Sequence, residues 1–111
     1  MKGKGIKKDY SKSVDWLKKA AKRGNVYAQY NLADCYMKGE GVNQDNKEAF
    51  KWYKKAAEQG DCDAQYYLSK LYLKGVGTDV DEDKAKYWLI KAHENGHKNA
   101  QKALDSLNNN F

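Results

Sequence analysis

The sequence WYKKAAEQG, residues 52–60, occurs in three related copies along this chain. The other two copies are WLKKAAKRG at residues 16–24 and WLIKAHENG at residues 88–96, so each step is 36 residues. A repeat of this length is typical of stacked supersecondary units, each of which buries its apolar face against its neighbours.

The same interval organises the whole chain. Eleven of the 36 positions hold the same residue in every copy, among them the positions of Trp52, Gly60 and Gln65. Since about three repeats are needed for a stable stack, we predict a single domain over residues 1–111. The predicted units are repeats 1–36, 37–72 and 73–108, followed by a tail at 109–111.

Two helices are predicted in each repeat. Apolar residues recur at helical spacing in both halves of the unit, and a glycine between the halves ends the first helix. The predicted first helices cover about 10–22, 46–58 and 82–94, and the second about 26–38, 62–74 and 98–108. Caps at the first helices come from Asp9, Asp45 and Asp81, and caps at the second from Asn25, Asp61 and His97. Because the joint is short, each pair forms an antiparallel hairpin, and the fold class is all-α.

The three tryptophans at equivalent positions are predicted core residues. Trp16, Trp52 and Trp88 lie on the apolar face of each first helix, where neighbouring alanines allow helices to approach closely. Cys35 occupies a core position, and Cys62 lies at a helix start too far away for a disulfide, so both are predicted to be free thiols.

The two ends of the array differ. In the last helix Lys102, Asp105 and Asn108 replace aromatic or small residues of the earlier copies, which predicts a water-facing cap. At the first helix no upstream element is predicted to cover Tyr10 and Val14. We therefore expect either self-association or a missing repeat there.

Composition excludes several classes of protein. No apolar run is long enough for a membrane span, and no secretory signal is visible in residues 1–25, although a signal removed earlier leaves the compartment open. Two cysteines are too few for a disulfide scaffold. The net charge of +6 lies entirely in the first repeat, because lysines plus arginine exceed acidic residues by six there and balance them in the other two repeats.

The pattern of Ala28, Leu32, Tyr36, Gly39, Gly41, Val42, Asp45, Ala49, Trp52, Ala56, Ala57 and Gly60 resembles the Sel-1-like repeat, a 36-residue relative of the tetratricopeptide repeat. The resemblance covers essentially the whole chain in one register. It implies a right-handed superhelix of helix pairs, an α-solenoid that acts as a non-catalytic adaptor for protein partners. Ala33, Ser69 and Asp105 depart from it where the family usually has glycine, and Asn43 stands where it often has proline.

The predicted partner-binding residues lie on the exposed arc of the first helices, which lines the concave side in related repeat families. Tyr87 and Ile90 are apolar where other copies carry charge, so they form either a binding surface or a packing contact with the tail or the second repeat. The predicted contact set is Asp15, Lys18, Lys22, Lys51, Lys54, Tyr87 and Ile90.

Two other functions are open alternatives to protein binding. Nucleic acid or another anionic surface could bind the basic side chains of the first repeat, which are Lys2, Lys4, Lys7, Lys8, Lys12, Lys18, Lys19, Lys22 and Arg23. An enzyme is less favoured, because no catalytic arrangement is legible and His93 and His97 straddle Gly96. Cysteine-rich relatives connected with penicillin binding carry a regular cysteine pair per repeat, which this chain lacks. We predict no catalytic residues, cofactor or metal.

Overall fold

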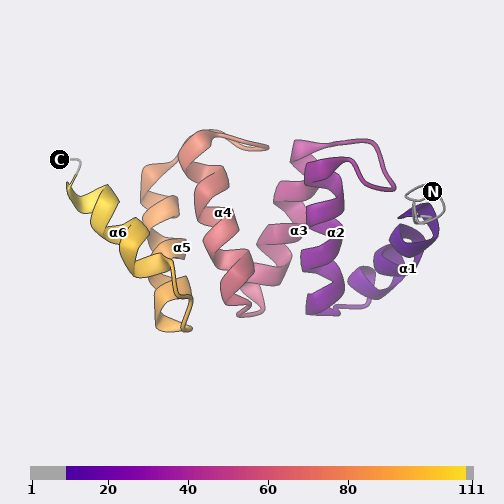
Figure 1. The fold of residues 1–111 in the computed structure, drawn as a ribbon, viewed down its shortest axis with the longest axis horizontal. Coiled ribbons are helices and arrows are strands. Elements are labelled where there is room, and N and C mark those ends of the chain that lie inside the picture. Colours follow the sequence, from indigo (N-terminus) through magenta and orange to yellow (C-terminus); the bar gives the residue numbers. More distant parts are fainter. Residues whose placement is uncertain (1–9, 110–111) are drawn as a thin grey trace, which may run out of the picture.

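The computed structural model describes residues 10–109, and this part of the chain forms six helices in a row. They are α1 (Tyr10–Lys22), α2 (Val26–Lys38), α3 (Asn46–Glu58), α4 (Cys62–Lys74), α5 (Glu82–Glu94) and α6 (Ala100–Asn109). The molecule is elongated, 49 × 31 × 26 Å, with the first and last helices at opposite ends (Figure 1). The predicted all-α solenoid of antiparallel hairpins is confirmed, and the arrangement is consistent with a right-handed superhelix.

Side chains cap the helices as the sequence predicts, with one exception. The carboxylate of Asp45 accepts from the backbone N–H groups of Lys47 and Glu48 at 3.0 and 3.1 Å, and Asn25, Asp61 and Asp81 make equivalent bonds. His97 does not cap a helix that starts at once, because α6 begins at Ala100. Asp9 lies outside the described residues.

The longer connections between hairpins turn at a glycine. Gly39 and Gly75 end α2 and α4 in the left-handed conformation, with φ of 73° and 69°. The N–H of Gly39 donates to the carbonyl of Cys35 at 2.7 Å, which satisfies a terminal helix carbonyl. A non-glycine residue would be strained there.

Small residues let the helices pack closely. Alanines of both helix sets are fully buried, including Ala28, Ala49, Ala56, Ala64 and Ala85. The most extensive contacts join α2 to α3 and α4 to α5, so each second helix packs chiefly on the first helix of the next repeat. The core is therefore formed between repeats as much as within them.

The tryptophans are not equally buried, which corrects one prediction. Trp52 is 7% exposed, Trp88 is half-buried and Trp16 is 59% exposed. Trp52 lines a common cavity with Lys22 of α1 and Leu32 of α2, and Trp88 lies near Ala57 and Gln65 of the preceding helices. Among the described residues, no helix pair precedes α1, and Trp16 therefore has no equivalent helices to pack against. Burial of a tryptophan at this position depends on the helix pair before it.

The predictions for the two ends have different outcomes. Val14 is buried, so it is not left uncovered at the first helix, while the side chain of Tyr10 is outside the described ones. At the other end Lys102, Asp105 and Asn108 are exposed, as expected for a cap. Both cysteines are free thiols; Cys35 is only partly buried, and burial followed by the charges of Asp34 and Glu40 raises its pKa.

Glutamines link successive helices through hydrogen bonds that the sequence analysis did not predict. The buried Gln65 amide donates to the carbonyl of Ala57 in α3 at 3.0 Å, and its oxygen accepts from Asn95 at the end of α5 at 3.0 Å. Gln29 makes the same pair of bonds one repeat earlier, with Ala21 and Gln59 at 3.1 and 2.8 Å. We call these bonds the glutamine links; each joins three consecutive helices at their turn-side ends.

Candidate partner-binding groove

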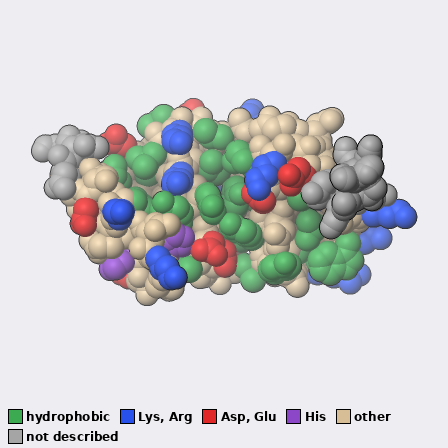
Figure 2. Space-filling model, viewed as in Figure 1, with side chains coloured by type: hydrophobic (Ala, Val, Ile, Leu, Met, Phe, Trp, Pro, Cys, Tyr) green, Lys and Arg blue, Asp and Glu red, His purple; other side chains and the backbone are tan. Residues whose placement is uncertain are grey.

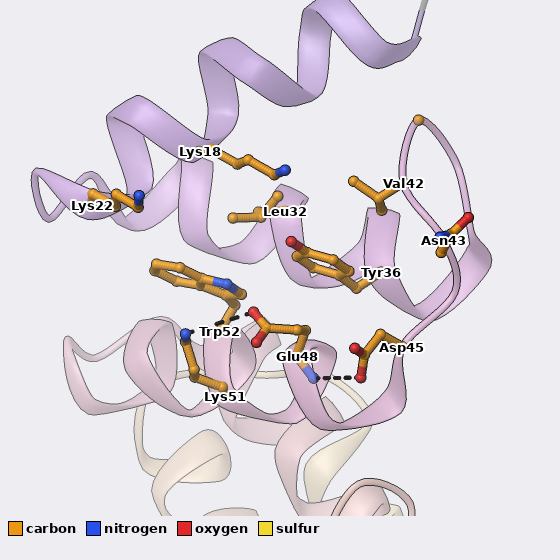
Figure 3. A pocket seen from close by; sticks show the side chains of 11 residues that line it. Lys18, Lys22, Leu32, Tyr36, Val42, Asn43, Asp45, Glu48, Lys51 and Trp52 are labelled. Carbon is orange, nitrogen blue, oxygen red and sulfur yellow. Dashed lines mark hydrogen bonds and ion pairs between the residues drawn. The ribbon is translucent and has the colours of Figure 1, made fainter.

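A groove of about 900 Å³ lies between α1, α2 and α3 (Figure 3). Its apolar lining comes from Leu32 and Tyr36 of α2 and Trp52 of α3. Lys18 and Lys22 extend over it from α1. Lys51, Asp45 and Glu48 complete it from α3 and its N-terminal cap, and the 41–43 segment closes one end. We call this cavity the first groove.

Some charged side chains of the first groove form ion pairs and others do not. Glu48 forms an ion pair with Lys51 at 3.6 Å, and the Lys51 ammonium lies 5.0 Å from the ring centroid of Trp52. Lys18 and Lys22 form no ion pair with any described carboxylate. The groove therefore presents two ammonium groups beside an aromatic floor.

Tyr36 is the polar group of the floor. Its backbone carbonyl accepts from the N–H of Asp45 at 2.9 Å, which holds the loop against α2. Burial raises the pKa of the Tyr36 phenol, and the carboxylates of Glu48 and Asp45 raise it further. The phenol is thus a neutral hydrogen-bonding group at physiological pH.

The groove recurs in part at the next repeat. Lys54, the equivalent of Lys18, lines a smaller cavity of about 300 Å³ with Tyr72, Asp81 and Lys84, which are the equivalents of Tyr36, Asp45 and Glu48. Another cavity of about 470 Å³ lies between α3, α4 and α5, where Tyr87 and Trp88 face Glu58. The odd-numbered helices thus carry a row of grooves that is basic near α1 and aromatic and acidic near α5.

The structure gathers part of the predicted contact set. Lys18, Lys22 and Lys51 line the first groove, and Lys54 and Tyr87 line the cavities beyond it. Asp15 is exposed on α1 and lines none of these three cavities. Ile90 is 42% exposed and Tyr87 is 53% exposed, with the Tyr87 ring perpendicular to that of Trp88.

Sequence reasoning missed an aromatic cluster that joins α2, α3 and α4. The rings of Tyr30, Tyr53 and Tyr67 lie within 6.1 Å of one another, and Tyr66 extends the cluster. Hydrophobic side chains are visible over α4 in Figure 2. The signal was present in the sequence as nine tyrosines. The sequence analysis did not pair them with one another.

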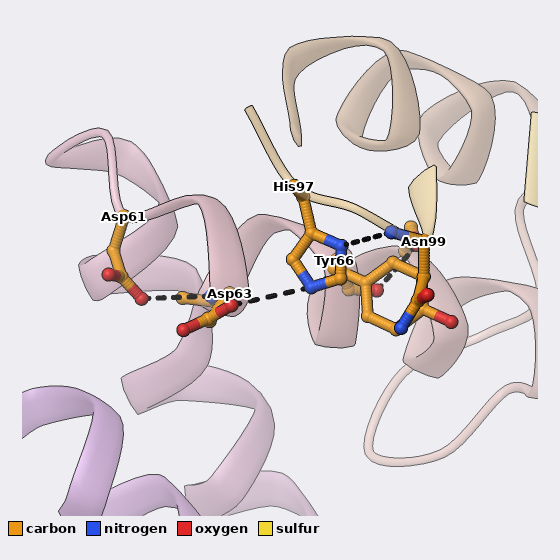
Figure 4. A network of polar contacts seen from close by, with 7 residues as sticks. Asp61, Asp63, Tyr66, His97 and Asn99 are labelled. Atoms are coloured by element: carbon orange, nitrogen blue, oxygen red, sulfur yellow. Dashed lines mark hydrogen bonds and ion pairs between the residues drawn. The ribbon is translucent and has the colours of Figure 1, made fainter. Parts of the chain in front are cut away.

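His97 lies at one end of this cluster and has a structural role (Figure 4). Its ring stacks on Tyr66 with centroids 4.2 Å apart, and its Nδ1 accepts from the backbone N–H of Asn99 at 3.1 Å. Its Nε2 therefore carries the proton and faces Asp63 at 3.3 Å. His93 is exposed on α5, so the two histidines do not form a common site.

Neither a metal site nor a membrane-spanning helix is present in the described part of the chain. Between residues 10 and 109 no three side chains of histidine, cysteine or acidic type gather closely enough to hold a metal ion. None of the described helices combines the length and apolar character needed to cross a membrane.

Comparison with known families decides the identity of the repeats. The family model described as Sel1 repeat matches residues 1–25, 26–61 and 62–97. The chain belongs to the Sel1 repeat family. The matched Sel1 units 26–61 and 62–97 each contain a second helix followed by the next first helix, which are the pairs with the most extensive contacts. Sel1 repeats are generally scaffolds for protein interaction.

Solved structures agree with this assignment. A Sel1 repeat protein from Oxalobacter formigenes is 36% identical with a TM-score of 0.83, over 85% of this chain and 39% of that protein. A protective antigen of uropathogenic Escherichia coli with an SLR fold is 42% identical with a TM-score of 0.78, over 80% of this chain and 19% of that protein. Cysteine-rich protein B of Helicobacter pylori is 28% identical with a TM-score of 0.80, over 84% of this chain and 70% of that protein. This chain thus spans well under half the length of the first two.

Proposed function

We propose that this Sel1 repeat chain is an adaptor that binds a partner polypeptide along the odd-numbered helices, with the first groove as the principal contact. One observation carries the proposal: the groove combines an apolar floor with two ammonium groups, Lys18 and Lys22, that have no described acidic partner. Aromatic anchors in pockets and nearby charged groups are the features that dominate protein interfaces.

The chemistry of the groove favours a particular kind of segment. Lys18 and Lys22 are one helical turn apart, so they can both face one acidic side chain or a pair of them. Trp52, Leu32 and Tyr36 offer an apolar surface next to these charges. The segment that fits best carries an apolar side chain flanked by aspartate or glutamate.

Affinity capture from the source cell, followed by titration of the captured protein, tests this proposal. Lys18→Glu combined with Lys22→Glu is expected to weaken binding of that protein by at least about tenfold, since each lost charged contact costs on the order of 1 kcal/mol or more. Lys98→Glu combined with Lys102→Glu, which changes the same charge outside the groove, is the matched control. Equal binding by both variants would exclude the first groove as the contact.

The aromatic end of the row has a separate test. Tyr87→Glu combined with Ile90→Glu places charge on two exposed apolar side chains without disturbing a buried one. If the partner extends along all three odd-numbered helices, this variant also loses affinity. If it binds only the first groove, the variant binds normally.

A further inference from the structure

A second groove lies at the α1 end of the array, on the side away from the first groove. It has a volume of about 490 Å³ and lies between α1 and α2. Its apolar lining is Trp16, Leu17, Tyr27 and Cys35, and Asp34 and Glu40 border it. Trp16 and Tyr27 are among the most exposed large hydrophobic side chains in the described chain. We call this cavity the end groove.

The repeat itself shows what kind of element fills such a groove. The residues equivalent to Leu17 and Asn31, 36 positions later, are Tyr53 and Tyr67. In that interior position, Tyr30 of α2 inserts between α3 and α4, with ring centroids 5.7 Å from Tyr53 and 6.1 Å from Tyr67. An α-helix therefore occupies the interior counterpart of the end groove and inserts an aromatic side chain.

The direction of that helix follows from a further hydrogen bond of Gln59. Gln59, at the end of α3, donates to the carbonyl of Gly24 at 3.0 Å, just before α2 begins. A helix in the end groove placed as α2 is placed on α3 therefore starts near the end of α1, beside Lys19 and Arg23. It ends near Asp34 and Glu40. Lys19 and Arg23 favour acidic residues in its first turn, and Glu40 favours basic residues in its last turn, whereas Asp34 already pairs with Lys38 at 3.2 Å. The helix dipole favours the same pattern.

This chain's own last helix does not meet these requirements. α6 has no acidic residue in its first turn and no basic residue in its last. Lys102 stands where α2 has Tyr30, so a second copy would offer a lysine to the aromatic position. α4 does have the required pattern, with Asp63 in its first turn, Lys74 in its last, and Tyr66 at the aromatic position.

We propose that the end groove binds an amphipathic α-helix of a partner protein, with an acidic first turn, a basic last turn and one aromatic side chain that inserts between α1 and α2. The probe is a fluorescein-labelled synthetic peptide with the sequence of residues 61–74, in which Cys62 is replaced by serine. A hydrocarbon staple on its polar side holds it helical, because an isolated helix of this length is marginal in water.

Fluorescence anisotropy of this peptide with the full chain gives the test. We expect saturable binding that Trp16→Ala weakens at least tenfold, as for a buried tryptophan anchor. Tyr87→Ala, which removes an exposed aromatic side chain from α5, is expected to leave binding unchanged. A peptide with Tyr66→Lys, which imitates α6, is expected not to bind.

Other outcomes overturn the proposal. Absence of peptide binding, or equal binding by the Trp16→Ala variant, rules out the end groove as a helix site. Sedimentation tests whether a second copy is the occupant. If the chain dimerises, if Trp16→Ala abolishes the dimer, and if the peptide does not compete with dimerisation, then a second copy fills the end groove and the partner-helix proposal is wrong. Binding in the first groove is independent of these results, because Trp16 does not line it.

Discussion

The equivalent tryptophans allow a stability prediction in which residue type and position in the repeat are fixed and only burial varies. A buried aromatic side chain removes about 150–250 Å² from water, which at about 25 cal/mol/Å² corresponds to about 4–6 kcal/mol. Trp52 retains 7% of its exposure, so Trp52→Ala is expected to cost about 3–5 kcal/mol. Trp16 retains 59%, so Trp16→Ala is expected to cost about 2 kcal/mol. Trp88→Ala should fall between them.

Equilibrium urea denaturation followed by far-UV circular dichroism measures these differences, because the signal does not depend on the tryptophan that was removed. Overlap with a second probe, such as tyrosine absorbance, checks that unfolding is two-state, since repeat arrays can unfold in parts. The urea concentration at the midpoint is expected to decrease least for Trp16→Ala, more for Trp88→Ala and most for Trp52→Ala. If Trp16→Ala costs as much as Trp52→Ala, then the reasoning that each tryptophan is buried by the preceding helix pair is refuted.

Three further predictions concern buried polar groups and backbone geometry. Gln65→Leu removes a glutamine link and leaves the carbonyl of Ala57 without its side-chain donor, so we expect a loss of about 1–3 kcal/mol by urea denaturation; a loss no larger than that of an exposed Gln101→Leu would contradict it. Gly77→Ala is expected to destabilise more than Gly60→Ala, because both glycines have positive φ but only at Gly77 would a Cβ overlap the backbone of α3, and thermal unfolding of the two variants compares them. Tyr53→Phe is expected to reduce the loss of stability at alkaline pH. Burial, followed by the charge of Asp34, raises the folded pKa of Tyr53 above its unfolded value near 10, so its contribution to the free energy of unfolding is complete below pH 10 and declines above it by up to about 1.4 kcal/mol per pH unit. Denaturation at pH 8 to 12 measures this, and an equal decline of the free energy of unfolding with pH in both chains would contradict it.

Helix positions could be predicted from the sequence because the residues that start and end each helix act locally. Glycine ends the first helices and a carboxylate or amide starts the next, and each of these choices depends on a few neighbouring residues. The late start of α6 escaped prediction because His97 is held by Tyr66 and Asp63, which lie more than 30 positions earlier in the sequence. Contacts between repeats are invisible to a rule based on adjacent residues.

The groove was predictable only in part. An exposed arc of charged residues on the first helices placed Lys18, Lys22 and Lys51 on one surface. The floor could not be foreseen, because Leu32 and Tyr36 reach the first groove from α2, the helix expected to be buried. Trp16 was wrongly predicted to be a core residue for a related reason. It lies on the same face of its helix as Trp52 does, but its burial depends on a neighbouring helix pair and not on the sequence of its own helix.

The glutamine links lie along a single border of the molecule, the one formed by the short turns after Gly24, Gly60 and Gly96. The opposite border carries the longer connections at residues 39–45 and 75–81. These bonds oppose separation of successive helices at their short turns. We therefore expect a partner that changes the width of the first groove to displace whole helices about these turns, so that the cavities farther along the row change with it.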